Sequence, residues 1–290
     1  MDLLSIDSLT DGQIAGLLDT AQEFADRPGS SASLQGKVVF NMFYENSTRT
    51  AMSFATAAAR LGAQTITLSV EHSSVKKGET LADTAATLAA MAPDAIVLRH
   101  RDNGAPGQVA ELVACPVINA GDGTNEHPTQ ALLDALTLRQ RFGRLDGLSV
   151  AIVGDIRHSR VARSNAKLLR RLGATVRLAG PPALLPEDLP SDGIEQAIAG
   201  ADAVMMLRVQ RERMAEELGD APGEYLSRYG LTEERLALAA PHAVVLHPGP
   251  MNRGVEIADT VADGSRSLIR RQVANGVAVR MAVLELLAGA

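Results

Sequence analysis

Eight short apolar runs alternate with stretches of helical composition along this chain, and no other feature restricts its fold as strongly. The runs lie at residues 37–43, 64–70, 94–98, 116–119, 149–153, 175–179, 202–207 and 243–247. Apolar runs with helices between most of them are typical of parallel sheets, in which each connection between strands is a crossover helix. The alternation therefore predicts an α/β protein with parallel sheets.

A chain of 290 residues is longer than one hydrophobic core usually serves, and its pattern divides in two. Residues 60–63 and 171–174 both have the sequence Arg-Leu-Gly-Ala, in which a glycine ends a helix just before a strand begins. A helix from Pro128 to about Arg141 is expected to link the two halves. We predict two doubly wound parallel-sheet domains with the active site in the cleft between them.

The predicted domain boundaries follow from that linking helix. The first domain covers residues 1–130, and the second covers residues 131–274. The C-terminal segment, residues 275–290, contains a strongly apolar helix and is expected to pack back on the first domain.

Charge, cysteine content and hydropathy argue against several classes of protein. The net charge of −6 disfavours non-specific binding of nucleic acid, which requires a basic surface. The single Cys115 cannot form an internal disulfide, which is typical of a reducing compartment. No apolar run reaches the ~20 residues of a membrane-spanning helix, and residues 1–8 lack the basic flank and apolar core of a signal peptide. We expect a cytoplasmic protein that binds neither nucleic acid nor a membrane.

Residues 43–50, Phe-Tyr-Glu-Asn-Ser-Thr-Arg-Thr, form the first candidate site. They follow an apolar run that indicates a buried strand, and they precede residues 51–61, whose composition indicates a helix. The hydroxyl groups and the guanidinium group of residues 47–50 thus lie at a helix N-terminus, where free N–H groups and the helix dipole favour an anion such as phosphate. An N-capping cluster beside a solvated arginine would have the same sequence, so the motif alone leaves both interpretations open.

A second signature covers residues 121–130, Gly-Asp-Gly-Thr-Asn-Glu-His-Pro-Thr-Gln. Pro128 suits the first position of a helix, which makes His127 a candidate cap. Gln130 lies three residues after His127, so both side chains share one face and can reach the same ligand. An imidazole and a neutral amide together suit a carbonyl oxygen and an NH₂ group, although a helix start with a structural histidine would look the same.

Further polar side chains follow the predicted strands. They are Arg99 and His100, Gly154 and Asp155, Arg208, and His247 and Pro248. Loops beyond the carboxyl ends of parallel strands form the binding crevice of open sheets, so we expect these residues to converge. Several cations would then lie in one cleft of an acidic protein, which predicts a strongly anionic ligand. These cations are Arg49, Lys77, Arg99, Arg160 and Arg208.

The two signatures, Ser-Thr-Arg-Thr at residues 47–50 and His-Pro-Thr-Gln at residues 127–130, resemble those of the carbamoyltransferases. Residues 73–80, Ser-Ser-Val-Lys-Lys-Gly-Glu-Thr, are similar to a loop in which the aspartate carbamoyltransferases carry a lysine that the ornithine enzymes lack. His-Pro-Gly-Pro at residues 247–250 and Leu-Arg-Val-Gln at residues 207–210 also resemble the aspartate enzymes. The resemblance extends over most of the chain, with its motifs in the expected order.

The resemblance implies a role for each matching residue. Ser47, Thr48, Arg49 and Thr50 would bind the phosphate of carbamoyl phosphate. Thr50, Arg99 and His127 would surround its carbonyl oxygen. The remaining residues of the carbamoyl phosphate site would be Gln130, Ser73, Lys77, Pro248 and Gly249. Gln130 would hold the carbamoyl NH₂ group. L-Aspartate would be bound by Lys77, Arg160, Arg208 and Gln210. Catalysis would depend on Arg49, Thr50, Lys77, Arg99 and His127.

The resemblance also implies a reaction and an assembly. The amine of aspartate would attack the carbamoyl carbon and phosphate would leave, without a metal or cofactor, in a step of pyrimidine biosynthesis. Glu45 of the first domain would pair with Arg160 and Arg213 of the second and hold the closed state. The family forms homotrimers in which Ser73 and Lys77 reach the active site of the neighbouring subunit, and some members add a regulatory or dihydroorotase-like chain.

Two positions depart from the family pattern. Ala51 follows Ser-Thr-Arg-Thr where the family commonly has a basic residue, and Ala55 follows Ser-Phe where the family commonly has glutamate. The two positions lie four residues apart on a helix, so the two alanines together replace an ion pair of the family. Such a pair contributes roughly 0.2–0.5 kcal/mol to helix stability. The lost positive charge bears on the affinity for carbamoyl phosphate rather than on the class of reaction.

Other functions fit the sequence less well. A nicotinamide dehydrogenase would share the fold class, but no Gly-x-Gly-x-x-Gly follows a predicted strand with an acidic residue about 20 positions later. A metal hydrolase would need clustered ligands, and His242 and His247 have no matching pattern. Another carbamoyltransferase, such as ornithine carbamoyltransferase, and a non-catalytic scaffold paralogue remain the alternatives. A scaffold is expected to lose active-site residues, whereas this chain keeps Arg49, Lys77, Arg99, His127, Arg160 and Arg208.

Overall fold

A computed structural model describes residues 1–69, 78–187, 193–209 and 223–289. The chain divides into two compact units, which we call the first unit and the second unit. The first unit is Met1–Leu136 together with Val273–Ala290, and the second is Thr137–Gln272. Both boundaries lie inside helices, one in α5 (Pro128–Phe142) and the other in α11 (Ile269–Ala288).

Helix α11 is longer than the apolar segment from which it was predicted. Its first turns contain Gln272 and Asn275, which are polar but buried, so hydropathy does not mark them as helix. Gln272 is stabilised there because its Oε1 accepts a hydrogen bond from the backbone N–H of His247 at 2.9 Å.

Among the described residues, every helix is too short or too polar to span a membrane.

The first unit contains a sheet of four parallel strands in the order β2-β1-β3-β4. The strands are β1 (Val38–Phe43), β2 (Gln64–Ser69), β3 (Ala95–His100) and β4 (Val117–Asp122). Its helices are α1 (Asp11–Asp26), α2 (Thr48–Arg60), α3 (Leu81–Ala89), α4 (Ala105–Ala110), the first part of α5 and most of α11.

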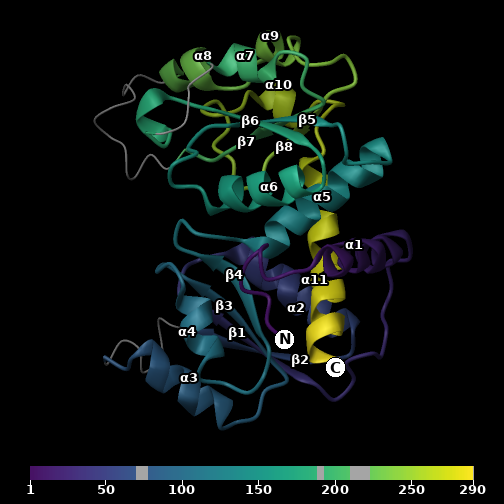
Figure 1. Ribbon diagram of the computed structural model, residues 1–290, viewed down its shortest axis with the longest axis vertical. Helices are drawn as coiled ribbons and strands as arrows, with labels where there is room; N and C mark the ends of the chain where they lie inside the picture. Colours follow the sequence, from purple (N-terminus) through teal and green to yellow (C-terminus); the bar gives the residue numbers. More distant parts are fainter. Residues whose placement is uncertain (70–77, 188–192, 210–222, 290) are drawn as a thin grey trace. The chain divides into compact units, whose positions relative to one another are not determined.

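Helices cover both faces of this first sheet (Figure 1). Phe40 and Met42 of β1 pack with Ala85 of α3 and Val109 of α4. Asn41 lies between them in sequence and points to the opposite face, because side chains alternate along a strand. Helix α2 contacts β1 and β2, and Figure 1 shows it with α11 on that opposite face. The prediction of a doubly wound domain is confirmed for this unit.

The second unit repeats the arrangement, with four parallel strands in the order β6-β5-β7-β8. The strands are β5 (Ser149–Val153), β6 (Thr175–Ala179), β7 (Ala203–Met206) and β8 (Val244–Leu246). The helices are α6 (Arg160–Arg171), α7 (Ile194–Ile198), α8 (Glu224–Tyr229), α9 (Glu233–Leu236) and α10 (Asp259–Ala262), with a short 3₁₀ helix at Pro182–Leu184. Helices α7, α9 and α10 pack on one face through Ile198, Leu236 and Val261, and α6 covers the other (Figure 1).

The strand order predicts a binding crevice at the same point of each sheet. The first strand of each unit, β1 or β5, is central and has the second strand on one side and the third on the other. The chain therefore winds in opposite directions from that strand, and ligands of such sheets bind outside the carboxyl ends at this switch point. These points lie between β1 and β3 in the first unit and between β5 and β7 in the second.

The two units also share an aspartate that fastens the central strand to its neighbour. Oδ2 of Asp94, just before β3, accepts a hydrogen bond from the N–H of Val38 at 2.8 Å. Oδ2 of Asp202, just before β7, accepts one from the N–H of Ser149 at 2.8 Å. Burial alone would raise the pKa of Asp94, but the Val38 N–H and the Lys37 ammonium stabilise the carboxylate and lower the pKa overall.

Substituting Asp94 with asparagine is expected to lower the free energy of unfolding by about 1 kcal/mol at neutral pH. The stabilisation by the carboxylate is complete above the ordinary Asp pKa of 3.8 and is lost as the pH falls toward the lower folded-state pKa. The difference in the free energy of unfolding between wild type and Asp94→Asn should thus be smaller in acid than at neutral pH. Urea unfolding at neutral pH and in acid measures this difference. Asp26→Asn, on an exposed turn of α1, is the control and should show no such difference. A difference that grows in acid would contradict the prediction.

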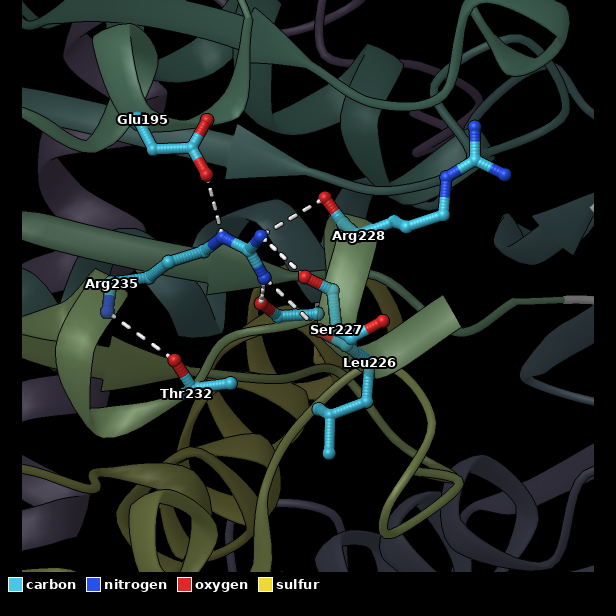
Figure 2. Close-up of polar contacts among 7 residues, drawn as sticks. Glu195, Leu226, Ser227, Arg228, Thr232 and Arg235 are labelled. Carbon is cyan, nitrogen blue, oxygen red and sulfur yellow. Dashed lines mark hydrogen bonds and ion pairs between the residues drawn. The ribbon is translucent and has the colours of Figure 1, made fainter. Parts of the chain in front are cut away.

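Arg235 joins three short helices of the second unit (Figure 2). Its Nη1 donates to the carbonyls of Leu226 at 3.0 Å and Gly230 at 2.7 Å, and its Nη2 donates to those of Ser227 at 2.7 Å and Arg228 at 3.1 Å. These carbonyls lie at the C-terminal end of α8, where helical hydrogen-bond donors run out. The carbonyl of Leu226 also accepts from the N–H of Gly230 at 3.1 Å. The Nε of Arg235 donates to Glu195 of α7 at 2.8 Å. One guanidinium group therefore caps α8 and ties it to α7 and α9.

Candidate active site

The Ser-Thr-Arg-Thr motif lies at the N-terminus of α2, where the loop after β1 enters the helix at the switch point of the first sheet. Ser47 is the N-cap residue of α2, but its hydroxyl makes no capping hydrogen bond. Thr50 is buried, whereas Thr48 and Arg49 are exposed. The alternative interpretation of the motif as an N-capping cluster therefore does not explain Ser47. Hydroxyl, N–H and guanidinium donors at one helix N-terminus are what a phosphate requires.

Arg99 lies beside this motif because β1 and β3 are neighbours. Arg99 pairs with Phe43 in the sheet, and its carbonyl accepts a hydrogen bond from the N–H of Tyr44 at 2.9 Å. The Nε of Arg99 is 3.3 Å from Oε2 of Glu45, and Nη1 donates to the carbonyl of Ala120 at 3.4 Å. Glu45 thus forms an ion pair with Arg99 of its own unit. The bridge from Glu45 to Arg160 and Arg213 of the second unit stays a prediction, and Arg213 lies outside the described residues.

Asp122 organises the loop that precedes α5. Its Oδ1 accepts hydrogen bonds from Asn119 Nδ2 at 2.8 Å and from the N–H of Glu126 at 3.1 Å, and its Oδ2 accepts from the N–H of Gly104 at 2.7 Å. Gly123 is required in this loop, since it has a φ of +47° and a Cβ atom there would lie 2.8 Å from the carbonyl oxygen of Arg101. The hydrogen bonds of Asp122 therefore fix the conformation of the loop that leads to His127.

His127 and Gln130 lie at the start of α5, as the second signature predicts. Both side chains are buried, and the carbonyl of His127 accepts a hydrogen bond from the N–H of Gln130 at 3.0 Å. Nε2 of Gln130 donates to Oδ1 of Asp134 at 3.0 Å. These two residues, Arg99 and the Ser-Thr-Arg-Thr motif form what we call the first half-site.

The second unit places arginines at the corresponding strand ends. Arg160 begins α6, after the loop that follows β5, and the Oγ of Ser159 caps that helix by accepting from the N–H of Ala162 at 3.1 Å. In the same loop Oδ1 of the buried Asp155 accepts a hydrogen bond from the N–H of His158 at 3.1 Å. Arg208 follows β7 and is half-buried.

A buried network shapes the loop that carries Pro248 and Gly249. Nδ1 of His247 accepts a hydrogen bond from the N–H of Gly249 at 2.9 Å, so Nε2 carries the proton and donates to Oε1 of Glu256 at 3.2 Å. Oε1 of Glu256 also accepts from the N–H of Asn252, and Nδ2 of Asn252 donates to the carbonyl of Val209 at 3.1 Å. The loop is thus tied to the residue that follows Arg208. Arg160, Arg208, Pro248 and Gly249 form what we call the second half-site.

The structure therefore places the described members of the predicted site at strand ends or at the start of the helix that follows a strand. Four predicted residues, Ser73, Lys77, Gln210 and Arg213, are outside the described residues. Within the described ranges, no three histidine, cysteine, aspartate or glutamate side chains gather as metal ligands would.

Sequence reasoning missed three buried acids that hold the half-sites, namely Asp122, Asp134 and Glu256. Asp122 lies inside the second signature, and its position between two glycines was the signal that could have identified it. Asp134 and Glu256 have no such marker, because an acidic residue in a helix or loop is usually exposed.

The half-sites suit two anions and a carbonyl group. Arg49 and Arg99 supply guanidinium donors near a helix N-terminus, and His127 and Gln130 add an imidazole and an amide. Arg160 and Arg208 supply two further guanidinium groups in the second unit, each of which can bind a carboxylate through two parallel hydrogen bonds.

Comparison with known proteins agrees with this chemistry. Residues 1–140 match the family model for the carbamoyl-P binding domain of aspartate/ornithine carbamoyltransferase, and residues 146–287 match its Asp/Orn binding domain. The aspartate carbamoyltransferase catalytic subunits of Xanthobacter autotrophicus and Azorhizobium caulinodans are 56% and 54% identical to the chain. Both alignments cover 99% of this chain, and they cover 94% and 92% of those relatives.

Solved structures show the same fold. The aspartate transcarbamoylase of Trypanosoma cruzi in complex with N-(phosphonacetyl)-L-aspartic acid has a TM-score of 0.87 at 31% identity, over 98% of this chain and 94% of that one. The ornithine carbamoyltransferase of Pyrococcus furiosus has a TM-score of 0.89 at 28% identity, over 99% of this chain and 97% of that one. The matches cover both units and the motifs of both half-sites, so the chain belongs to the aspartate/ornithine carbamoyltransferase family.

Proposed function

We propose that this chain transfers the carbamoyl group of carbamoyl phosphate to the amine of L-aspartate, which gives N-carbamoyl-L-aspartate and phosphate. The observation that carries the proposal is the arrangement of Arg99 beside the Ser-Thr-Arg-Thr motif at the switch point of the first sheet. That arrangement, in a chain of this family, suits an acyl phosphate. The reaction is a step of pyrimidine biosynthesis, and we expect it to take place in the cytoplasm.

The choice of aspartate over ornithine depends on sequence and charge rather than on the fold. The fold resembles an ornithine enzyme and an aspartate enzyme to a similar degree, with TM-scores of 0.89 and 0.87. The relatives that are 54–56% identical are named as aspartate enzymes. Arg160 and Arg208 complement the two carboxylates of aspartate, whereas the side chain of ornithine ends in a cation that they would repel.

The mechanism assigns each substrate to one half-site. Residues 47–50 would bind the phosphate of carbamoyl phosphate, and Gln130 would accept a hydrogen bond from its NH₂ group. Arg160 and Arg208 would bind the two carboxylates of aspartate. Its uncharged amine attacks the carbamoyl carbon, and the carbonyl oxygen becomes an oxyanion beside Thr50, Arg99 and His127. The C–N bond forms, the C–O bond to phosphate breaks, and the nitrogen loses one proton to the departing phosphate or to solvent. Positioning of the reactants and stabilisation of the oxyanion each contribute several kcal/mol.

An assay with both products measured tests this function. The purified chain receives carbamoyl phosphate and L-aspartate, and carbamoyl aspartate and phosphate are quantified together. We expect equal amounts of the two products. Phosphate release without carbamoyl aspartate would mean that the chain is a hydrolase and not a transferase.

We also propose a homotrimer in which Lys77 of each subunit completes the active site of its neighbour. The proposal follows from the loop at residues 73–80, which resembles the family loop that crosses between subunits. It lies largely outside the described residues, so the support comes from sequence.

Mixing two inactive variants is expected to restore activity if the sites are shared. Lys77→Ala and His127→Ala chains are each expected to be inactive alone. After subunit exchange, some sites receive Lys77 from one chain and His127 from the other, so about a quarter of the sites in a random mixture should be complete. Light scattering with a tagged subunit verifies the exchange. A mixture that exchanges subunits yet stays inactive would mean that Lys77 acts within its own chain.

A further inference from the structure

Asp134 is a buried group of the first unit that the proposed mechanism does not use. It lies one helical turn after Gln130 on α5, and its side chain has no exposed surface. Its Oδ1 accepts a hydrogen bond from Nε2 of Gln130 at 3.0 Å. A carboxylate in such a place costs free energy unless charges and hydrogen bonds offset the loss of water.

This hydrogen bond decides which end of the Gln130 amide can serve a ligand. An ionised carboxylate accepts hydrogen bonds and cannot donate them, so the NH₂ group of Gln130 must turn toward Asp134. The carbonyl Oε1 is then the end of the amide that remains to accept from a ligand. With a partner that can both donate and accept, the amide could turn over and present its NH₂ group instead.

A buried cation favours the ionised form of Asp134. Arg280 of α11 is buried, and its Nη1 donates to Oγ of Ser53 on α2 at 2.9 Å and to the carbonyl of Gly276 at 3.2 Å. Burial lowers the pKa of Arg280 to about 10, and Arg99 acts in the same direction while Asp134 acts against both. Arg280 therefore stays protonated at neutral pH, and its charge stabilises the carboxylate of Asp134.

We propose that Asp134 is a positioning residue that makes the first half-site prefer a carbamoyl group to an acetyl group. The proposal depends on the proposed function, in which Gln130 contacts the NH₂ group of carbamoyl phosphate. Asp134 holds the Gln130 amide so that Oε1 faces this NH₂ group. An acetyl group has almost the same shape but carries a methyl group there, which leaves Oε1 without a donor and weakens binding.

The test compares two stable ligands that differ at this one group. Phosphonoacetamide carries a methylene in place of the bridging oxygen of carbamoyl phosphate and keeps the NH₂ group. In 2-oxopropylphosphonate a methyl group also replaces the NH₂ group. Calorimetric titration gives the dissociation constant of each ligand for the wild type, Asp134→Asn, Asp134→Ser and Gln130→Ala. Both ligands titrate the same folded protein, so a general loss of structure leaves the ratio of the two constants unchanged.

We expect the wild type to prefer phosphonoacetamide and Asp134→Asn to lower that preference about tenfold. Asp134→Ser, whose hydroxyl can both donate and accept, should lower it similarly and serves if the asparagine variant does not fold. Gln130→Ala should remove the preference, and adding Asp134→Asn to it should change nothing more.

Two further outcomes separate this proposal from the proposed function. If Gln130→Ala removes the preference while Asp134→Asn and Asp134→Ser keep it within twofold of the wild type, the positioning role is wrong and the proposed function stands. If the wild type shows no preference, or if Gln130→Ala keeps it, Gln130 does not contact the NH₂ group. The assignment of the carbamoyl site is then wrong as well.

Discussion

Arg99→Ala is expected to lower kcat about 10²–10³-fold, because in the proposed mechanism Arg99 donates to the oxyanion. The positive charge of Arg99 gains most when the carbonyl oxygen becomes negative, so the effect should appear in kcat more than in the KM for carbamoyl phosphate. The fold should survive the substitution. Glu45, the ion-pair partner of Arg99, is partly exposed and can be solvated when the guanidinium group is lost.

Arg101→Ala is the matched control for this prediction. Arg101 lies two residues beyond Arg99 at the same strand end, and its side chain is 81% exposed. It should keep kcat near the wild-type value, as surface substitutions usually do. Arg99→Lys keeps the charge but loses the planar fork of donors, so we expect its kcat to lie between those of Arg99→Ala and Arg101→Ala. A kcat for Arg99→Ala within threefold of the wild type would remove Arg99 from the catalytic mechanism.

Arg235→Ala is expected to lower the free energy of unfolding by about 2–4 kcal/mol, since several charge-assisted hydrogen bonds are lost at once. The side chain of Arg235 is 14% exposed, and the carbonyls that it binds at the end of α8 would be left without this donor (Figure 2). The contribution of Glu195 to this effect is small, because that side chain is 55% exposed and well solvated.

Urea unfolding of Arg235→Ala, Arg228→Ala and the wild type measures this effect. Arg228 is the control because its side chain is 54% exposed and pairs with Glu224 on the surface of α8. Its loss should cost less than about 1 kcal/mol. Equal destabilisation by the two substitutions would show that the capping contacts of Arg235 contribute no more than a surface ion pair.

The strands were predictable from sequence because each is a short apolar run between polar turns. The run at residues 149–153 coincides with β5, and the run at residues 175–179 coincides with β6. Strand β5 is central in a sheet covered by helices, so every residue after Ser149 is apolar and the run ends where the strand ends. Strand β6 lies at the edge of the sheet and contains the polar residues Thr175 and Arg177, but its other three residues are apolar and mark it as a strand. The start of α11 was not predictable in this way, because Gln272 and Asn275 are buried through specific hydrogen bonds or packing that hydropathy does not register.

The same distinction between visible pattern and specific contacts holds for the candidate site. Residues 47–50 and His127 could be proposed from the sequence because their chemistry is unusual for a strand end or a helix start. The acids Asp122, Asp134 and Glu256 were not, because their role depends on burial and on partners that lie elsewhere in the chain, such as Gly104 for Asp122. A sequence shows which residues can react, but it does not show which carboxylates become buried to orient them.

The identity of the preferred acceptor is the central question for this chain. A competition assay answers it: the purified protein receives carbamoyl phosphate with equal concentrations of L-aspartate and L-ornithine, and mass spectrometry quantifies both carbamoylated products. Arg160 and Arg208 complement two carboxylates, so we predict carbamoyl aspartate in large excess, with one phosphate released for each product molecule. Carbamoyl ornithine as the main product would contradict this assignment, and no product from a folded, trimeric sample would show that the chain is a non-catalytic member of the family.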